Sequence, residues 1–325
     1  QRHLINGGRE AVPVLRKMVD GGDLETIENA IAVLAKIGED EEPWRNNGAI
    51  ATRESIATSS FGTKATVAKS TLKSFAEQRG RDARIHLSDI GVFVGPKTVA
   101  LGSRSSLRPI VRIDKNWNGD VESLAWLRWI GDVSFVIVEG DAVTPKVMEA
   151  IIRMPNFTTI VIVDCELTVP TIEVLQRRPR IDAIELRYTP LNEELLAALS
   201  KMRIRNALFL MGTETTEERV QRLRVDLPGL EITLRRGGFL GVLCRTTLKD
   251  SCEVSEVMSE SGAEEAGLQA GDTIIRIDDA KITRFDDLQR QINTHQAGDE
   301  VKIRFRRNGD VFQTSAKLKK LQNRN

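Results

Sequence analysis

The sequence predicts a multidomain α/β protein, and three observations lead to this prediction. Residues 1–80 place apolar side chains at helical spacing, the range 81–234 contains a repeated strand-plus-helix pattern, and residues 235–325 alternate apolar and polar side chains between turn motifs. Each pattern buries its apolar surface in a different way. We therefore expect a helical segment, an array of strand-plus-helix repeats, and a C-terminal segment built mainly of strands.

The bulk composition narrows the classes of function. The chain has 325 residues, enough for two or three domains, and its net charge of +1 favours neither nucleic acid nor an acidic membrane surface as a partner. No apolar run approaches the roughly 20 residues that cross a bilayer. Gln1 lies within a helical pattern, so we expect the chain to be a fragment from which any targeting segment has been removed.

The first third of the chain is predicted to be helical. Apolar residues from Ala11 to Leu15 precede a helix from Asp23 to Gly38, with Asp23 as its N-cap. Two further helices are expected at residues 50–59 and 63–78. The helix after Asp23 resembles the second helix of a HEAT repeat, which implies two HEAT-like pairs. Residues 80–110 show no clear pattern.

The middle of the chain repeats with a step of 24 residues. The apolar pattern that begins at Val133 recurs from Phe157 and from Ile181, and Leu208 and Ile232 keep the same step. The units resemble leucine-rich repeats, in which a strand and a helix bury their apolar faces only by stacking on neighbouring units. The resemblance implies helices on the convex side of a curved sheet, whose parallel strands lie near residues 135–138, 159–163, 183–187 and 207–211.

The bend after each strand supports this interpretation. Cys165, Thr189 and Thr213 occupy the position that turns inward to satisfy backbone groups, so Cys165 is interpreted as structural rather than nucleophilic. An irregular first unit is expected at residues 111–113, with Asn116 at the bend. The array also resembles the short, degenerate repeats of planctomycete-type bacterial proteins.

The other face of the predicted sheet is apolar where a free concave face is usually polar. Glu139, Glu185 and Arg187 lie nearer one edge. A patch of this kind indicates a covered surface or a partner site, and packing against another domain of the same chain is the favoured interpretation. The positions concerned are Phe135, Ile137, Val161, Val163, Phe209 and Met211.

The C-terminal segment predicts strands and turns from its local pattern. Strands are expected at residues 273–277, 301–305 and 311–318, and a helix at residues 285–292 has one apolar face. Asn308 and Gly309 suit a type I′ hairpin turn, which needs positive φ angles. Lys319, Lys320 and Arg324 are interpreted as a solvated tail.

Two motifs within this segment favour ligand binding. Gly237 and Gly238 precede Phe239–Val242, a stretch in which consecutive backbone N–H groups can point at one anion. About twenty residues later, the stretch from Ser261 to Asp272 predicts a short helix closed by glycine. Together they resemble a PDZ domain of the kind attached to bacterial periplasmic proteases, over residues 232–320. The resemblance implies a C-terminal, partly open β-barrel. PDZ domains bind peptides and catalyse nothing themselves.

The resemblance implies a peptide groove without a cofactor. A ligand would add as a strand beside residues 242–244, with its carboxylate on the amides of Leu240, Gly241 and Val242 and near Arg235 or Arg236. The ligand's last residue would be apolar, because the pocket beneath is apolar. The candidate peptide-binding residues are Arg236, Phe239, Leu240, Gly241, Val242, Leu243, Cys244, Leu288 and Ile292.

Other motifs weigh against catalysis and metal binding. Residues 114–120 match the first half of an EF-hand calcium loop, but Ala125 stands where the bidentate glutamate belongs, so we interpret the segment as a turn. The three histidines are scattered, and no motif of a hydrolase or phosphate loop is present, so we expect no enzyme. His295 is interpreted as a surface residue. Cys244 and Cys252 flank the predicted connection between two strands. They could form a disulfide or remain two buried thiols, and the sequence is compatible with both.

Three hypotheses for the function follow. The first is a scaffold of interaction modules whose PDZ domain binds C-terminal or extended peptides. The second is a structural or envelope protein whose groove is empty or self-occupied, and the third is the regulatory part of a larger, truncated enzyme. The PDZ resemblance favours a location outside the cytoplasm, in the periplasm or cell envelope.

Overall fold

A computed structural model describes residues 2–39, 48–59, 63–102, 104–245 and 251–321. The chain forms two compact units. Residues 1–94, 116–134 and 149–157 form the first unit, and residues 95–115, 135–148 and 158–325 form the second. Along the described residues, no helix is long and apolar enough to cross a membrane.

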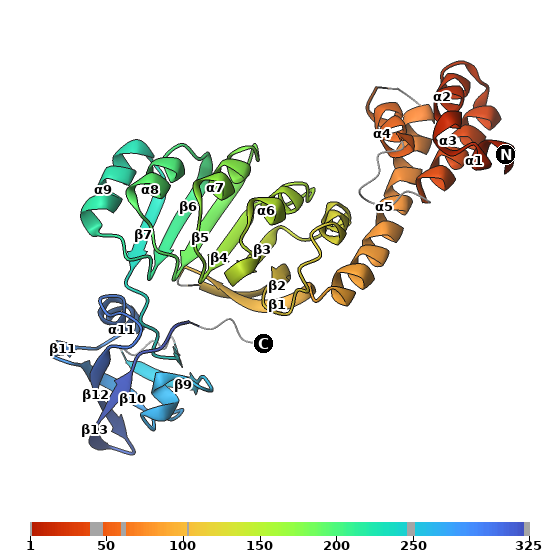
Figure 1. The fold of residues 1–325 in the computed structure, drawn as a ribbon. Helices are drawn as coiled ribbons and strands as arrows, with labels where there is room; N and C mark the ends of the chain where they lie inside the picture. The colour runs from red at the N-terminus through yellow and green to blue at the C-terminus, as the bar shows by residue number, and fades with distance from the viewer. Residues whose placement is uncertain (1, 40–47, 60–62, 103, 246–250, 322–325) are drawn as a thin grey trace. The chain divides into compact units, whose positions relative to one another are not determined.

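The first unit consists mainly of helices (Figure 1). The predicted N-cap is confirmed, because the Asp23 carboxylate accepts a hydrogen bond from the Thr26 amide at 2.9 Å. The apolar faces of the helices meet in the core of this unit, which includes Leu15, Ile31 and Ile56. The helices are α1 (Arg2–Asn6), α2 (Val12–Gly21), α3 (Leu24–Glu39), α4 (Ala49–Ser59) and α5 (Thr63–Asp89), with a 3-10 turn at Gly8–Ala11.

Helix α5 is longer than the sequence pattern indicates. The expected end near residue 78 is wrong, since the helix continues to Asp89. A distant 3-10 helix, η2 (Ser123–Trp129), packs on the added turns. The rings of His86 and Trp126 stack with their centroids 4.5 Å apart. A contact with a segment about forty residues away stabilises these turns, and the local pattern does not show it.

The second unit contains a seven-stranded sheet in the order β1 to β7. From β2 to β7 each strand pairs in parallel with the next, and Val136, Ile160, Ile184, Leu208 and Ile232 are consecutive partners in register. The strands are β1 (Phe93–Leu101), β2 (Arg104–Ile113), β3 (Phe135–Glu139), β4 (Thr159–Val163), β5 (Ile181–Arg187), β6 (Ile204–Met211) and β7 (Glu231–Arg235). The parallel pairing predicted at the 24-residue step is therefore confirmed.

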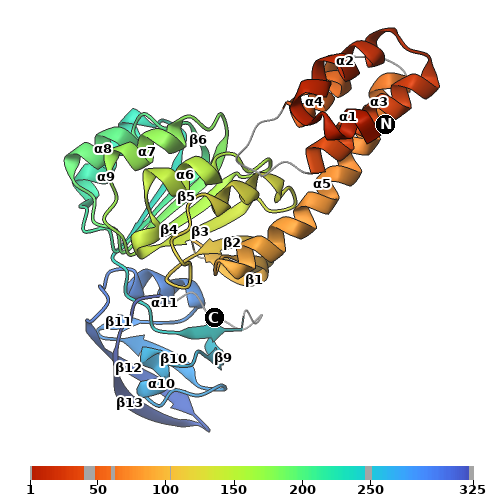
Figure 2. The ribbon, with the colours of Figure 1, turned by 45° about the vertical axis from the view of Figure 1, so that its right-hand side comes forward.

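Helices cover one side of this sheet. Figures 1 and 2 show α7, α8 and α9 side by side on that face. The short helix η3 (Gly140–Ala142) follows β3. The longer helices are α6 (Pro145–Ile151), α7 (Val169–Gln176), α8 (Glu193–Leu199) and α9 (Glu217–Asp226).

The backbone repeats at the bends as well as in the strands. Gly140, Asp164, Tyr188 and Gly212, each 24 residues from the next, all have φ between 49° and 63°. The amides of the last three donate to carbonyl oxygens at the end of the following strand, at 2.7–2.9 Å. These three bonds therefore tie each strand-plus-helix repeat to the next one. An L residue in this conformation is strained, so the repeated geometry is held by these contacts.

The inward positions after the bend are structural. Thr189 and Thr213 are buried, and the Thr189 hydroxyl donates to the Arg187 carbonyl at 3.0 Å. The Cys165 Sγ lies 3.7 Å from the Thr189 hydroxyl. Burial raises the pKa of the Cys165 thiol to about 11, which keeps it protonated at neutral pH and a poor nucleophile.

Strands β1 and β2 occupy the region that the sequence pattern left without a prediction. Val99 of β1 and Ile110 of β2 pack with Phe135 and Val161 in one apolar cluster on the sheet face opposite the helices. Phe135 and Val161 are at most 1 % exposed. Residues from this β1–β2 segment, together with Ala297 and Leu321 from the C-terminal part of the second unit, thus pack on this part of the apolar face. Phe209 is only partly buried.

A buried ion pair fixes the end of this segment. Arg187 and Glu185 are 0 % and 1 % exposed and lie 2.9 Å apart. Arg187 donates to the Ala100 carbonyl at 2.6 Å, and the Gly102 amide donates to Glu185 at 3.0 Å. Two of the three charges expected near one edge of the concave face, Glu185 and Arg187, therefore hold Ala100 and Gly102 at the end of β1.

The C-terminal part of the second unit is a six-stranded sheet, ordered β13-β12-β10-β9-β8, with β11 paired to β10. Asn308 and Gly309 have φ of 53° and 94°, as the predicted hairpin turn requires. The sheet and helices α10 and α11 enclose an apolar core. The elements are β8 (Val242–Cys244), β9 (Cys252–Val257), α10 (Gly262–Glu265), β10 (Thr273–Ile277), β11 (Ala280–Lys281), α11 (Phe285–Ile292), β12 (Glu300–Arg307) and β13 (Asp310–Lys317).

Candidate functional site

A pocket of about 150 Å³ opens between β8, α11 and the loop before β8. Strand β8 is the last strand of its sheet, so its outer edge has no strand partner in the described part of the chain. The pocket brings together seven of the nine candidate residues: Phe239, Leu240, Gly241, Val242, Leu243, Leu288 and Ile292.

Two candidate residues lie elsewhere. Arg236 lines a separate hollow together with Thr213 and Gln296, and its amide donates to the Asn293 carbonyl at 3.2 Å. Cys244 ends β8 and does not line the pocket. Arg235 lines the pocket instead. Of the two arginines, only Arg235 lines the peptide pocket, and it also lines the neighbouring hollow with Arg236.

The loop before β8 is held at four points. The Gly238 amide donates to the His295 carbonyl at 2.8 Å, and Phe239 exchanges two backbone hydrogen bonds of 3.0 Å with Lys319. The carbonyl oxygens of Leu240 and Gly241 accept from amides of the segment that contains α10. These bonds occupy the carbonyl oxygens of Phe239, Leu240 and Gly241.

The same loop leaves two donors available. Among the described residues, the amides of Leu240 and Gly241 donate to no acceptor. A donor without a partner is costly when it is shielded from water, and an anion that accepts from both donors removes that cost. Gly241 has φ of +87°. Successive N–H groups in such a loop form a concave anion site.

The floor of the pocket is apolar. Leu240, Val242, Leu288 and Ile292 are each less than 9 % exposed. Helix α11 forms one wall, and its start is held by Asp287, whose carboxylate accepts from the Thr283 hydroxyl at 2.5 Å and from the Thr283 amide at 3.0 Å. Hydrogen bonds from Thr283 lower the pKa of Asp287, so the cap is ionised at neutral pH.

A cation lies at the pocket's side. Arg235 Nη1 donates to the Gly102 carbonyl at 3.0 Å. Burial lowers the pKa of Arg235, while nearby Glu185 opposes that shift. An arginine stays protonated in proteins, so Arg235 brings a fixed positive charge to the pocket that Leu240 and Gly241 also line.

The cysteine pair next to β8 consists of thiols. The Sγ atoms of Cys244 and Cys252 are 3.3 Å apart, and both residues are free cysteines. The hydrogen bond from Cys252 lowers the pKa of Cys244 and raises that of Cys252. Cys252 is fully buried in the core.

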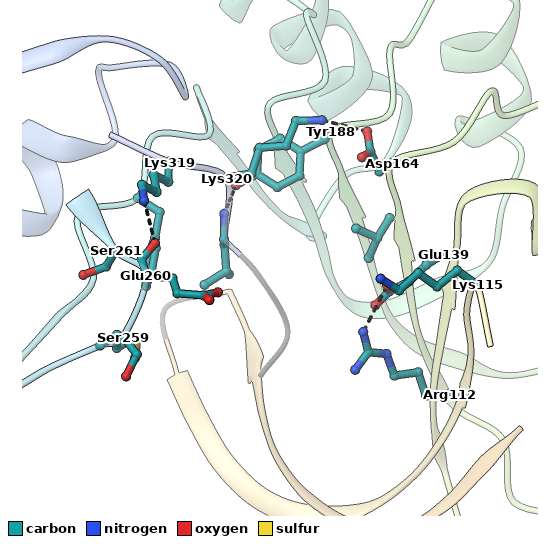
Figure 3. Close-up of a pocket in the computed structure, with 14 residues that line it drawn as sticks. Arg112, Lys115, Glu139, Asp164, Tyr188, Ser259, Glu260, Ser261, Lys319 and Lys320 are labelled. Atoms are coloured by element: carbon teal, nitrogen blue, oxygen red, sulfur yellow. Dashed lines mark hydrogen bonds and ion pairs between the residues drawn. The ribbon is translucent and has the colours of Figure 1, made fainter. Parts of the chain in front are cut away.

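A second, larger pocket of about 730 Å³ lies beside the loop (Figure 3). Charged side chains line it, and several are paired: Lys320 with Asp164 at 2.8 Å, and Arg112 with Glu139 at 3.2 Å. The Lys319 ammonium donates to the Glu260 carbonyl at 2.8 Å. The expected solvated tail at Lys319 and Lys320 is therefore wrong, because both side chains have specific partners; residue 324 lies outside the described residues.

Tyr188 stands at one wall of this pocket. Its hydroxyl donates to the Gly237 carbonyl at 3.0 Å and accepts from the Leu321 amide at 2.5 Å. Burial raises the pKa of Tyr188 to about 12, so the phenol stays neutral and can make both bonds. One residue of the parallel sheet thus holds both the start of the ligand loop and the C-terminal segment.

The segment that matched half of a calcium loop is a turn. Asp114 pairs with Arg112 at 3.0 Å, and Asp120 accepts from the Ser123 amide and hydroxyl. These carboxylates are used within the protein. In the part of the chain that the structure describes, no group of three or more His, Cys, Asp or Glu could hold a metal ion.

The pocket includes residues that sequence reasoning missed. The pocket is also lined by Ala100, Gly102, Ser105, Met211 and Leu321. The first three come from a region without a regular pattern. No local signal indicates that this segment turns back toward the ligand loop, because its position depends on contacts with β5 and β7.

Comparison with known proteins places this site in a domain family. Residues 238–318 match the family model of the PDZ domain, and these residues form a PDZ domain. A probable periplasmic serine protease of Haemophilus influenzae is 40 % identical over 65 residues, which are 20 % of this chain and 14 % of that protein. The periplasmic serine endoprotease DegP of Salmonella typhimurium is 29 % identical over 114 residues, 35 % of this chain and 20 % of that protein.

The chain thus spans a fifth or less of the length of these curated relatives. Among solved structures, the PDZ domain of HtrA3 with a phage-derived ligand has a TM-score of 0.23 and 22 % identity, over 25 % of this chain and 85 % of that one. The PDZ domain of a carboxy-terminal protease from Vibrio cholerae, in complex with a peptide, has a TM-score of 0.23 and 18 % identity, over 26 % and 97 %.

Proposed function

We propose that this chain is a non-catalytic interaction protein whose PDZ domain binds the C-terminus of a partner protein. The observation that carries the proposal is the pair of available amides at Leu240 and Gly241, above an apolar floor and beside the Arg235 cation. A carboxylate accepts from both amides, and charge-assisted hydrogen bonds of this kind are the stronger ones.

The ligand adds as a strand to the outer edge of β8. Strand addition gives affinity through main-chain hydrogen bonds, while alternate side chains enter pockets. The ligand's last side chain contacts Leu240, Leu288 and Ile292, which favours an apolar C-terminal residue. Leu243, 37 % exposed, offers a further apolar contact along the strand.

The repeated units serve as the rigid part of the scaffold. We assign them to leucine-rich repeats, on the 24-residue step of the parallel strands and of the positive φ angles at the bends. We assign the first unit to HEAT-like helical pairs. Both kinds of repeat form extended interaction surfaces. The names of the relatives, periplasmic proteases, favour a location outside the cytoplasm.

Two observations each favour an alternative function. Leu321, in the chain's own C-terminal segment, lines the peptide pocket, which favours a self-occupied groove with a structural role. The matched relatives are proteases, which favours a regulatory part of a larger enzyme.

Titration of the chain with labelled peptides tests the main proposal. Peptides that end in Val, Leu or Phe are prepared with a free carboxylate and with an amide at the C-terminus. We expect the free form to bind at least about tenfold more tightly, because the amide loses a charge-assisted interaction. A matched peptide with a C-terminal Asp tests the apolar floor and is expected to bind weakly.

Equal affinity for the two forms would contradict carboxylate capture. Together with weak binding of every peptide, that result would support the self-occupied groove. Any hydrolysis of the peptides by the purified chain, measured by mass spectrometry, would contradict the non-catalytic part of the proposal.

A further inference from the structure

The peptide pocket contains residues from outside the matched PDZ segment. The match to the PDZ family model begins at residue 238. The same pocket that contains Leu240 and Leu288 is nevertheless also lined by Ala100, Gly102 and Ser105. These three residues belong to the β1–β2 segment, more than 130 positions earlier in the chain. The pocket is thus built from two parts of the second unit.

The turn between β1 and β2 is fixed by polar contacts. The Gly102 amide donates to Glu185 at 3.0 Å, and the Gly102 carbonyl accepts from Arg235 at 3.0 Å. Arg187 donates to the Ala100 carbonyl at 2.6 Å. Glu185 and Arg187 are fully buried, and buried charges are strongly destabilised when they lose a partner.

Steric contact fixes the same turn. Gly102 has φ of +57°, and a Cβ atom placed on it would come within 2.7 Å of the Phe209 ring. A bulkier residue at this position therefore strains the backbone and must displace the Phe209 ring. The turn is held against the sheet by shape as well as by hydrogen bonds.

Arg235 bonds this turn and also lines the pocket. Its guanidinium donates to the Gly102 carbonyl, and the residue lines the pocket together with the ligand loop. Ser105 lines the pocket too, and its side chain is exposed, so a change of charge there alters the field in the pocket without disturbing the core.

We propose that the β1–β2 turn, with Ser105 and the Arg235 guanidinium, forms the outer wall of the peptide pocket and sets which C-terminus binds. The inference rests on the proposed function, since the ligand is the carboxylate end of a peptide. The charge at position 105 tunes the affinity for a free carboxylate, and the PDZ segment alone does not determine specificity.

Charge variants of the full chain test this wall. Ser105→Lys is expected to strengthen and Ser105→Asp to weaken binding of a free-carboxylate peptide, each by about three- to tenfold at low salt, with the effect reduced by added salt. Binding of the amidated peptide is expected to change much less. The matched control is Leu107→Asp, on the same strand, 71 % exposed and not lining the pocket.

The result that overturns the proposal is an equal change in affinity for the variants at positions 105 and 107, or no change for either. A selective effect at position 105 on the free-carboxylate peptide supports it. Thermal unfolding of each variant shows whether the fold is retained, which is expected because both side chains are exposed.

A ligand-free measurement separates the wall from the proposed function. Ser105→Cys and Gln289→Cys are combined in a Cys244→Ser background and treated with a short bismaleimide. Both positions line the pocket, so cross-linking within one chain is expected, whereas Leu107→Cys with Gln289→Cys is expected to react far less. Cross-linking without any peptide binding would support the wall and contradict the proposed function; no cross-linking would overturn the wall.

Discussion

Gly241 shows how one residue determines the shape of the ligand loop. Its φ of +87° is a conformation that L side chains rarely adopt, and a Cβ atom placed there would lie 2.2 Å from the Cβ of Ser261. Ser261 cannot move easily, because it is the N-cap of α10 and accepts from the Glu264 amide. The loop therefore depends on glycine at this position for both backbone and space.

Gly241→Val is expected to abolish peptide binding. The β-branched side chain must either collide with Ser261 or shift the loop, and both displace the amides of Leu240 and Gly241. Affinity for a free-carboxylate peptide is expected to fall by at least about tenfold. Isothermal titration calorimetry measures this change.

The control for this prediction is Gly271→Val. Gly271 also has a positive φ, of +93°, but no heavy atom lies within 4 Å of the position of its Cβ. Both variants therefore carry backbone strain, and only the first blocks the ligand loop. Equal loss of binding in the two variants would show that strain in the domain, rather than the loop geometry, is responsible.

At the scale of elements, helix α11 forms the groove wall that faces β8, and its N-terminal cap couples the groove to pH. Asp287 accepts hydrogen bonds from Thr283 and from the Arg284 amide at 3.0 Å. Because these bonds lower its pKa in the folded state, the cap contributes stability above the ordinary pKa near 4. That contribution is lost as pH falls through the lowered value.

Asp287→Asn tests this coupling. The variant is expected to be less stable than the wild type at pH 7, and the difference is expected to shrink as the pH falls from about 4 toward 2. Urea unfolding at several pH values measures it. Asp286→Asn, exposed in the same helical turn, is the control and is expected to change little. A difference between Asp287→Asn and wild type that does not vary with pH would contradict the assignment.

The packing of the β1–β2 segment on the apolar face of the parallel sheet can be tested by substitution. Val161 is 0 % exposed and belongs to the cluster that includes Val99 and Ile110. Val161→Asp buries an unpaired carboxylate and is expected to cost about 3–5 kcal/mol of unfolding free energy. Chemical denaturation followed by circular dichroism measures this loss.

Val225→Asp is the matched control for that substitution. Val225, on α9, is 79 % exposed, so the same change is expected to alter stability by less than about 0.5 kcal/mol. A tolerated Val161→Asp would mean that the β1–β2 segment does not cover the sheet.

At the scale of the whole molecule, Tyr188 connects the repeat array to the ligand loop. It is the chain's single tyrosine and bonds both Gly237 and Leu321. Lys320 lies over its ring, 5.2 Å from the centroid, and pairs with Asp164. These contacts hold the PDZ domain to the sheet within the second unit.

Tyr188→Phe is expected to loosen this connection without unfolding either part. Removing the hydroxyl deletes two hydrogen bonds and is expected to cost about 1–3 kcal/mol. Hydrogen exchange of the segment 236–242 is expected to become faster, while exchange of β12 stays unchanged. Unchanged exchange in residues 236–242 would show that Tyr188 does not restrain the loop.

Local sequence patterns were sufficient to predict a large part of the fold of this protein. The 24-residue step predicted the parallel strands, and the ranges 273–277 and 285–292 coincide with β10 and α11. Asn308 and Gly309 predicted the hairpin turn. These features follow from side-chain periodicity and from the φ angles that a few residues permit, which depend on near neighbours along the chain.

Long-range packing determined the rest. The choice of Arg235 over Arg236 for the pocket, the extension of α5 by contact with η2, and the pairing of Lys319 with Phe239 have no local pattern. The β1–β2 segment reaches the pocket because the buried pair of Glu185 and Arg187 holds it. Contacts between residues far apart in sequence are set by how the elements pack together, and only the folded chain brings those residues into contact.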